Sequence, residues 1–304
     1  MKSNRFASLP ARVTVVEVGP RDGLQNESAS IPTAVKVAFV DALSQAGLPV
    51  IEVTSFVRPE SIPQLADADE VMRAIHRKPG VRYPVLVPNE RGFDRARAAD
   101  AREIAVFTAA SEEFNRRNIN ATIEESIKRF EPVVADAKAS GMRVRGYVST
   151  AFGCPYEGDI KPRAVLDVTG KLLALGIDEV SIGDTIGVAT PNQVAELCSL
   201  LRSEIDAGKL ALHFHDTRGT ALANVLAGLE AGVAIFDSSA GGLGGCPYAP
   251  GAAGNLATED LIYMLDGMGI STGVDIDKVV DASRLVAAHL GHAPTSKYFQ
   301  AATS

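Results

Sequence analysis

The sequence predicts an α/β fold, a (β/α)8 TIM barrel with an extra C-terminal helical segment. Three observations predict it. Eight short runs rich in β-branched residues recur along the 304 residues, helical periodicity fills the intervals between them, and successive runs start about 20 to 40 residues apart. Such intervals hold a strand, a loop, a helix and a second loop, whereas antiparallel hairpins would place the strands closer together. A doubly wound open sheet is the competing arrangement.

The expected elements follow one another in order along the chain. Strands are expected at residues 13–18, 50–54, 83–87, 103–108, 144–149, 179–183, 210–215 and 234–238. Helices with recognisable starts lie between them. Thr122 with Glu125 opens one helix. Thr190, Pro191 and Gln193 give another helix an N-cap, a first-turn proline and a capping-box partner. One face of that helix carries Val194, Leu197, Cys198 and Leu201.

We expect residues 1–304 to form a single barrel domain. No linker rich in Pro, Gly or Ser and no break in composition divides the chain. A further helical pattern follows Asp275, beyond the eighth strand and helix. We therefore expect residues from about 275 to 304 to form a helical extension, which would cover part of the barrel or contact another subunit in a homo-oligomer.

The composition excludes several classes of protein. Lys and Arg number 30 against 37 Asp and Glu, so the formal charge is −7 and no basic face for nucleic acid is expected. No apolar stretch approaches 18 residues, and no run of signal-peptide length precedes Val13, so we expect no membrane span and no export. Cys154, Cys198 and Cys246 are too few for a disulfide framework. These features predict a protein of the cytoplasm.

Two histidines give the strongest local signal for chemistry. His213 and His215 end the seventh expected strand, where positions i and i+2 share a face, and reactive residues of barrels lie at these carboxyl ends. Asp22 follows the first strand, which closes the ring one strand away from the seventh, and is the natural third ligand. Imidazole and carboxylate suit Mn, Fe, Co or Zn, whereas carboxylate, amide oxygen and water suit Mg or Mn. The alternatives are two hydrogen-bonded histidines at the barrel mouth and a surface salt bridge for Asp22.

A buried charge is expected beside this group. Glu52 lies inside the apolar run of residues 50–53, where a carboxylate needs a partner, and Arg21 at the adjacent strand end is a reasonable one. Arg21 could stabilise an oxyanion or a substrate carbonyl as a fixed cation. A purely structural ion pair is equally compatible with the pattern.

A glycine-rich loop follows the eighth strand. Residues 240–248 contain four glycines and Cys246, and such a loop can close over a site with the thiol as proton donor or nucleophile. The alternative is a mobile turn with a bystander thiol. Cys198, on an apolar helix face, is expected in the core, and Cys154 stays undecided. We assign no site role to His76, His289 or His292.

With these residues in hand, the sequence resembles the 3-hydroxy-3-methylglutaryl-CoA lyase family, part of a superfamily of metal-dependent lyases and Claisen-type barrels. The resemblance runs from about Val13 to Val280. It is carried, in order, by residues 16–27, 51–56, 145–149, 153–158, 183–188, 213–217 and 241–260. The Gly-Leu-Gly-Gly-Cys-Pro-Tyr loop is far more specific to this family than His-x-His.

The resemblance implies a divalent cation, Mg or Mn, held by residues matching Asp22, His213, His215 and Asn255. The implied reaction cleaves a 3-hydroxy-3-methylglutaryl thioester of coenzyme A into acetyl-CoA and acetoacetate in a retro-aldol step. Arg21 is then expected to stabilise the enolate oxygen, with Glu52 orienting Arg21. Cys246 would protonate the acetyl carbon or shuttle that proton, and the base would be Asp22 or His213. Further substrate contacts are expected from Gln25, Ser55, Ser181 and Thr185.

Four positions depart from the family pattern: Phe214, Arg218, Gly242 and Pro250. A cation at Arg218 near the barrel mouth would favour a different carboxylated or longer acyl chain. The nearest alternative function is therefore a sister lyase acting on citramalyl-CoA or an isoprenoid-extended glutaryl-CoA. A condensing synthase of the isopropylmalate or homocitrate type is a second alternative, against which the glycine-rich loop argues. A barrel without activity, kept as a scaffold, is the third.

Overall fold

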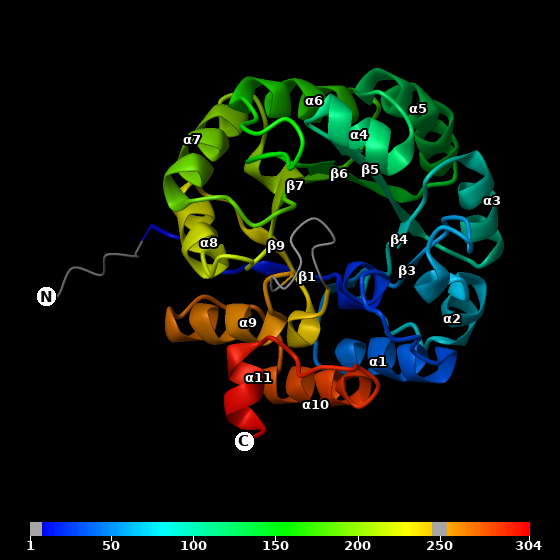
Figure 1. Ribbon diagram of the computed structural model, residues 1–304, viewed down its shortest axis with the longest axis vertical. Coiled ribbons are helices and arrows are strands. Elements are labelled where there is room, and N and C mark those ends of the chain that lie inside the picture. Colours follow the sequence, from blue (N-terminus) through cyan, green and yellow to red (C-terminus); the bar gives the residue numbers. More distant parts are fainter. Residues whose placement is uncertain (1–7, 245–253) are drawn as a thin grey trace, which may run out of the picture.

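Parallel strands surrounded by helices make up the structure (Figure 1). The computed structural model describes residues 8–244 and 254–304. Its strands are β1 (Thr14–Glu17), β2 (Val50–Ile51), β3 (Thr54–Ser55), β4 (Val85–Leu86), β5 (Glu103–Ala109), β6 (Arg143–Ser149), β7 (Glu179–Asp184), β8 (Leu210–Phe214) and β9 (Ile235–Ser238). Neighbouring strands in the sheet follow the order β2-β1-β9-β8-β7-β6-β5-β4-β3, and every pair is parallel.

The sheet closes on itself through the segment that contains β2 and β3. These are two pieces of one extended segment, interrupted at Glu52 and Val53. The Glu52 amide donates to the Glu17 carbonyl of β1 at 2.8 Å, and the Val53 amide donates to the Pro84 carbonyl beside β4 at 3.0 Å. One segment therefore bonds to both ends of the strand order. In the described residues this gives a ring of eight strands, which confirms the (β/α)8 barrel and excludes the open sheet.

Helices cover the outside of this ring (Figure 1). They are α1 (Thr33–Gln45), α2 (Ala68–Ala74), α3 (Glu90–Ala98), α4 (Glu112–Ile119), α5 (Ile123–Ala139), α6 (Pro162–Ala174), α7 (Pro191–Arg202), α8 (Ala221–Glu230), α9 (Thr258–Gly267), α10 (Ile276–Ala287) and α11 (Lys297–Ala302). The capping boxes predicted at Thr122 and Thr190 are both present. Cys198 is fully buried on the inner face of α7, as its apolar neighbours predicted.

Strand alternation separates an apolar layer from a polar interior. Residues such as Val106 and Ile182 point outward and pack in the main core beneath the helices. Inside the ring, a small apolar cluster of Val16, Val18 and Val50 lies beside charged side chains. The charged side chains meet across the barrel, since Arg145 Nη2 on β6 lies 2.6 Å from Asp237 Oδ1 on β9. Polar residues facing the interior can therefore converge on one end of the barrel.

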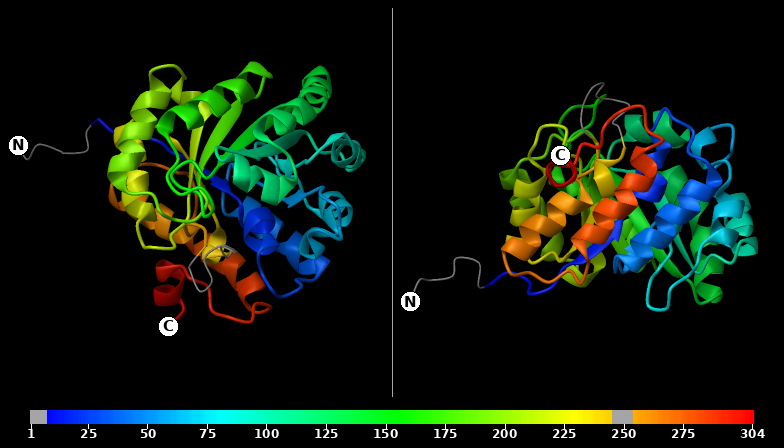
Figure 2. Two further views of the ribbon diagram at one scale, coloured as in Figure 1. Left: turned by 45° about the horizontal axis from the view of Figure 1, so that its top comes forward. Right: turned by 90° about the horizontal axis from the view of Figure 1, so that it is seen from below.

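The last helices pack against the side of the barrel. α10 contacts α1 and α9, and α11 contacts α9 (Figure 2). The predicted single domain of residues 1–304, with an extension from about residue 275, stays a prediction. Within the described residues no helix combines the length and the apolar character needed to cross a membrane.

Candidate active site

The chain leaves β1 through a single π-helical turn, Gly19–Gly23, which places Arg21 and Asp22 at the mouth of the barrel. The amides of both residues donate to the Val18 carbonyl, at 3.2 and 2.7 Å. Such turns are rare and often occur at functional sites. Gly23 is required here, because a Cβ at this position would lie 2.9 Å from Leu243 Cβ. The loop after β9 therefore packs directly on this turn.

Asp22, His213 and His215 come together at this end of the barrel. One potential ligand atom from each residue lies within 4.8 Å of those of the other two, and the two imidazole centroids are 5.2 Å apart. His213 on β8 and His215, directly after the end of β8, lie on the same face, as period-2 alternation predicts. Phe214, between them, is buried and packs its ring 6.1 Å from that of Phe152. The aromatic side chain that departs from the family pattern therefore lies in the core.

The three groups differ in their ionisation. Burial raises the pKa of Asp22, but the charges of Arg21 and the two histidines outweigh it and lower that pKa to about 2. Burial, followed by the charge of His213, lowers the pKa of His215 to about 3. Burial also lowers the pKa of His213, but its hydrogen bond to Asp237 outweighs this and the pKa is raised. At pH 7 the site therefore offers a carboxylate and a neutral imidazole with a free lone pair.

Asn255 completes the group of candidate ligands. Its Nδ2 donates to Asp22 Oδ2 at 2.9 Å and to the Leu243 carbonyl at 3.1 Å. Its Oδ1 and His215 Nδ1 are buried and have no hydrogen-bond partner among the described residues. Unpaired buried polar atoms are costly, and a cation would satisfy both of these. A carboxylate, two imidazoles and an amide oxygen therefore fit a divalent cation.

Arg21 is held beside this group by two carboxylates. Its Nη2 lies 2.8 Å from Glu52 Oε2, and its Nη1 lies 2.7 Å from Asp22 Oδ1. The pairing of Arg21 with Glu52 expected from the sequence is thus present. Tyr147 adds a third contact, because its hydroxyl donates to Glu52 at 2.8 Å and its ring lies 5.4 Å from the guanidinium carbon. These contacts fix the direction of the Arg21 guanidinium, which lines the pocket.

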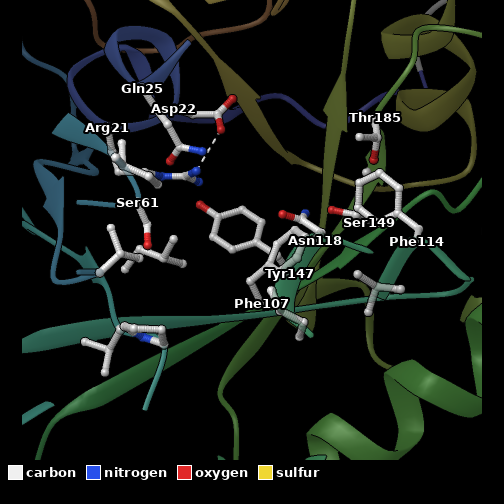
Figure 3. Close-up of a pocket in the computed structure, with 18 of the residues that line it drawn as sticks. Arg21, Asp22, Gln25, Ser61, Phe107, Phe114, Asn118, Tyr147, Ser149 and Thr185 are labelled. Atoms are coloured by element: carbon white, nitrogen blue, oxygen red, sulfur yellow. Dashed lines mark hydrogen bonds and ion pairs between the residues drawn. The ribbon is translucent and has the colours of Figure 1, made fainter. Parts of the chain in front are cut away.

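A pocket of about 820 Å³ opens onto this site. Pockets that bind small molecules have volumes of this size. Figure 3 shows Arg21, Asp22 and Gln25 on one side of it and Ser149, Thr185 and Phe114 on the other. Its wall contains aromatic rings together with charged and amide side chains, among them Phe107, Tyr147, Arg58, Asn118, Asn120 and Arg129. The pocket can therefore take a long ligand with both apolar and polar parts.

The expected substrate contacts are placed differently by the structure. Gln25, Ser181 and Thr185 line the pocket. Ser55 is fully buried, its hydroxyl accepts from the Val57 amide at 3.4 Å, and it is not among the lining residues. Its role as a substrate contact stays a prediction. Cys246 lies outside the described residues, so its role also stays a prediction.

Sequence reasoning missed several polar residues in the barrel interior. Arg145, Glu179 and Asp237 are buried and joined by ion pairs of 2.6 and 2.8 Å. Asp184, whose pKa burial raises to about 6, accepts from two amides of the loop that carries Thr185. The signal was available, because each is a charged residue inside an expected strand or at its end, the pattern that pointed to Glu52.

Together, the fold and the site define a barrel protein with donors for a divalent cation at the mouth of a ligand pocket. A family model described as HMGL-like matches residues 12–286, and the chain belongs to this family. Rat mitochondrial hydroxymethylglutaryl-CoA lyase is 52% identical over 299 residues, which cover 98% of this chain and 92% of the relative. The rat cytoplasmic 3-hydroxy-3-methylglutaryl-CoA lyase is 54% identical over 300 residues, 99% of this chain and 88% of the relative.

Solved structures agree with this membership. The chain is similar to hydroxymethylglutaryl-CoA lyase from Pseudomonas aeruginosa, with a TM-score of 0.96 and 51% identity over 97% of this chain and 99% of the other. It is also similar to an HMG-CoA lyase from Acinetobacter baumannii in complex with coenzyme A and 3-methylmalate, with a TM-score of 0.92 and 42% identity over 96% and 95% of the two chains.

Proposed function

We propose that this protein is a divalent-cation-dependent carbon–carbon lyase that cleaves 3-hydroxy-3-methylglutaryl-CoA into acetyl-CoA and acetoacetate. One observation carries the proposal: the donor cluster of Asp22, His213 and His215 opens onto the same pocket as the fixed cation Arg21. A retro-aldol cleavage needs these two features side by side, because one end of the breaking bond loses a hydroxyl proton and the other gains negative charge. Membership of the HMGL-like family supports it.

Asp22, His213, His215 and Asn255 would hold the cation, which we expect to be Mg or Mn. When bound, it supplies positive charge that lowers the pKa of the tertiary hydroxyl of the substrate. Either Asp22 or His213 would accept the hydroxyl proton. As the carbon–carbon bond breaks, its electron pair moves to the thioester, and Arg21 stabilises the enolate oxygen that forms.

The remaining residues position these groups and complete the reaction. Glu52, itself held by Tyr147, keeps the guanidinium of Arg21 directed at the pocket. Cys246 would give a proton to the enolate carbon, which yields acetyl-CoA, while the other fragment leaves as acetoacetate. Gln25, Ser181 and Thr185 would contact the acyl chain from the pocket wall.

The position of Arg218 gives less reason to expect a different acyl chain. Arg218 is exposed, and its Nη1 donates to the carbonyls of Ile186 and Gly187, at 2.9 Å each. It is not among the residues that line the pocket. Arg218, whose charge was the reason to consider a sister lyase, therefore ties two loops together and does not line the pocket.

The test is a panel of 3-hydroxyacyl-CoA thioesters, including citramalyl-CoA and an isoprenoid-extended glutaryl-CoA, assayed for acetyl-CoA release with and without a chelator. We expect 3-hydroxy-3-methylglutaryl-CoA to give the highest kcat/KM, and activity to vanish with chelator and return with Mg or Mn. Preference for another thioester would contradict the substrate assignment, and full activity in chelator would contradict the cation.

We also propose that the protein acts in the cytoplasm and forms a homo-oligomer. Cys154 and Cys198 are both buried free thiols, which is consistent with a reducing compartment. The rat relatives include a mitochondrial and a cytoplasmic lyase, so location is tested by cell fractionation. Oligomeric state is tested by light scattering, where a mass near 31.9 kDa would contradict the oligomer.

A further inference from the structure

Asp237 is a buried carboxylate with three fixed partners. It is the register partner of His213 on the neighbouring strand, so the two side chains share the inner face of the barrel. Its Oδ2 lies 3.2 Å from His213 Nδ1 and accepts from the Ser181 hydroxyl at 2.8 Å. Its Oδ1 accepts from Arg145 Nη2 at 2.6 Å. Both oxygens of Asp237 are therefore committed, and the carboxylate cannot turn away from His213.

This contact determines which nitrogen of His213 carries the proton. A carboxylate paired with Arg145 offers only lone pairs, so His213 Nδ1 must be the donor. A neutral imidazole carries one N–H, which leaves the free lone pair on Nε2. His215 differs, because its Nδ1 has no hydrogen-bond partner in the described part of the chain. The protein thus fixes one of the two imidazoles and not the other.

We infer that Asp237 is a positioning residue that holds His213 in the Nδ1-protonated tautomer, so that Nε2 is the nitrogen available to a cation, and that Arg145 and Ser181 hold Asp237 in place. The tautomer itself does not depend on the proposed function, but its purpose, cation binding, rests on that proposal. Carboxylates that bind the second nitrogen of a ligating histidine change metal affinity or activity by 10- to 100-fold when they are replaced.

The competing explanation is that Asp237 serves only to neutralise Arg145. The chain offers a matched control, because Arg145 has a second buried carboxylate partner, Glu179, at 2.8 Å from its Nε. Glu179 is 2% exposed and Asp237 is 1% exposed, so their burial is alike. Of these two carboxylates, only Asp237 joins the arginine to the histidine within the described residues. Asp237→Asn and Glu179→Gln therefore remove the same kind of charge from the same arginine.

Asp237→Asn has a specific expected effect. With Asn Oδ1 still accepting from Arg145, the amide nitrogen faces His213 Nδ1 and can only donate. His213 Nδ1 must then accept, which moves the ring proton to Nε2 and removes the lone pair from that atom. Glu179→Gln leaves the Asp237 carboxylate, and hence the tautomer of His213, unchanged.

The first readout is the long-range 1H–15N spectrum of the full-length chain with 15N-labelled histidine, in EDTA at pH 8.5. The His213 signals are assigned by their absence in His213→Gln. We expect the Nδ1-protonated pattern in the wild type and in Glu179→Gln, and the Nε2-protonated pattern in Asp237→Asn. A wild-type spectrum that shows the Nε2-protonated or an averaged pattern overturns the inference, even if a variant fails to fold.

The second readout is Mn2+ affinity, measured from free Mn2+ by electron paramagnetic resonance. We expect Asp237→Asn to bind Mn2+ 10- to 100-fold more weakly and Glu179→Gln to stay within threefold of the wild type. Equal losses in both variants would overturn the inference in favour of a structural role. If the wild type binds no Mn2+ and cleaves no thioester, the proposed function fails, while the tautomer spectrum still decides the role of Asp237.

Discussion

Glu17 provides a prediction whose size can be worked out from the structure. Its side chain is fully buried beneath the loop after β9, where Oε1 accepts from the amides of Gly19 and Ala240 and Oε2 accepts from the Thr258 hydroxyl. Burial, only partly offset by these hydrogen bonds, raises the pKa of Glu17 from 4.5 to about 7. A shift of this size corresponds to about 3 kcal/mol, at 1.36 kcal/mol for each pKa unit.

The direction in which the free energy of unfolding changes with pH follows from proton binding. Between about pH 4.5 and 7 the unfolded chain has released the Glu17 proton while the folded chain still holds it, so the free energy of unfolding falls as pH rises. Below pH 4.5 this loss is absent, and above pH 7 it is complete. Glu17→Gln removes the titration, and its amide nitrogen can donate to the Thr258 oxygen, whose hydroxyl then turns to Ser238 Oγ at 2.7 Å.

We therefore expect the stability of Glu17→Gln relative to the wild type to grow by about 2 to 3 kcal/mol between pH 5 and pH 8. The measurement is urea unfolding in EDTA followed by circular dichroism at several pH values. Glu196→Gln, at an exposed position on α7, is the control and should show no such growth. Growth below about 1 kcal/mol, or a change of opposite sign, would refute the burial argument.

Three further variants test the site. Arg21→Gln should lower kcat by about 10²-fold or more with the fold intact, because Arg21 acts on developing charge; a near-normal kcat would contradict its role. Cys246→Ser should keep Mn2+ affinity and lose thioester cleavage, and loss of Mn2+ binding would make Cys246 a ligand. Asn255→Ala should weaken Mn2+ binding measurably in a titration, since it removes the unpaired Oδ1 beside Asp22; an unchanged dissociation constant would exclude Asn255 as a ligand.

Much of the fold could be predicted because its signals are local. Strand runs, capping boxes and regular spacing are properties of short segments, and the structure has strands at all eight expected places. The interruption of the second strand at Glu52 could not be predicted, because it depends on hydrogen bonds to β1 and to Pro84. The π-helical turn after β1 was missed for a similar reason, since the packing of Gly23 against Leu243 involves a segment more than 200 residues away.

Some features of the site could likewise be predicted from the sequence, and others could not. The convergence of His213 with His215 follows from alternation within one strand, so it could be read from the sequence. The charges of Asp237 and Arg145 inside expected strands could also be read from the sequence, but their partners depend on strand register and on contacts across the barrel. Arg218 shows the opposite error, because a charge near the mouth in sequence turned out to bond loop carbonyls.

The barrel has a seam of short strands, formed by β2, β3 and β4. β2, β3 and β4 contribute two residues each to the ladder, whereas β5 and β6 contribute seven each. Fewer backbone bonds per strand make local opening easier, so amide protons around the seam should exchange with solvent faster than those of β5 and β6. Arg21 and Glu52 lie at the seam. His213 lies on β8 and His215 directly after β8, and both are away from the seam. Backbone hydrogen bonds beside the pocket can therefore open locally while the two imidazoles keep their positions.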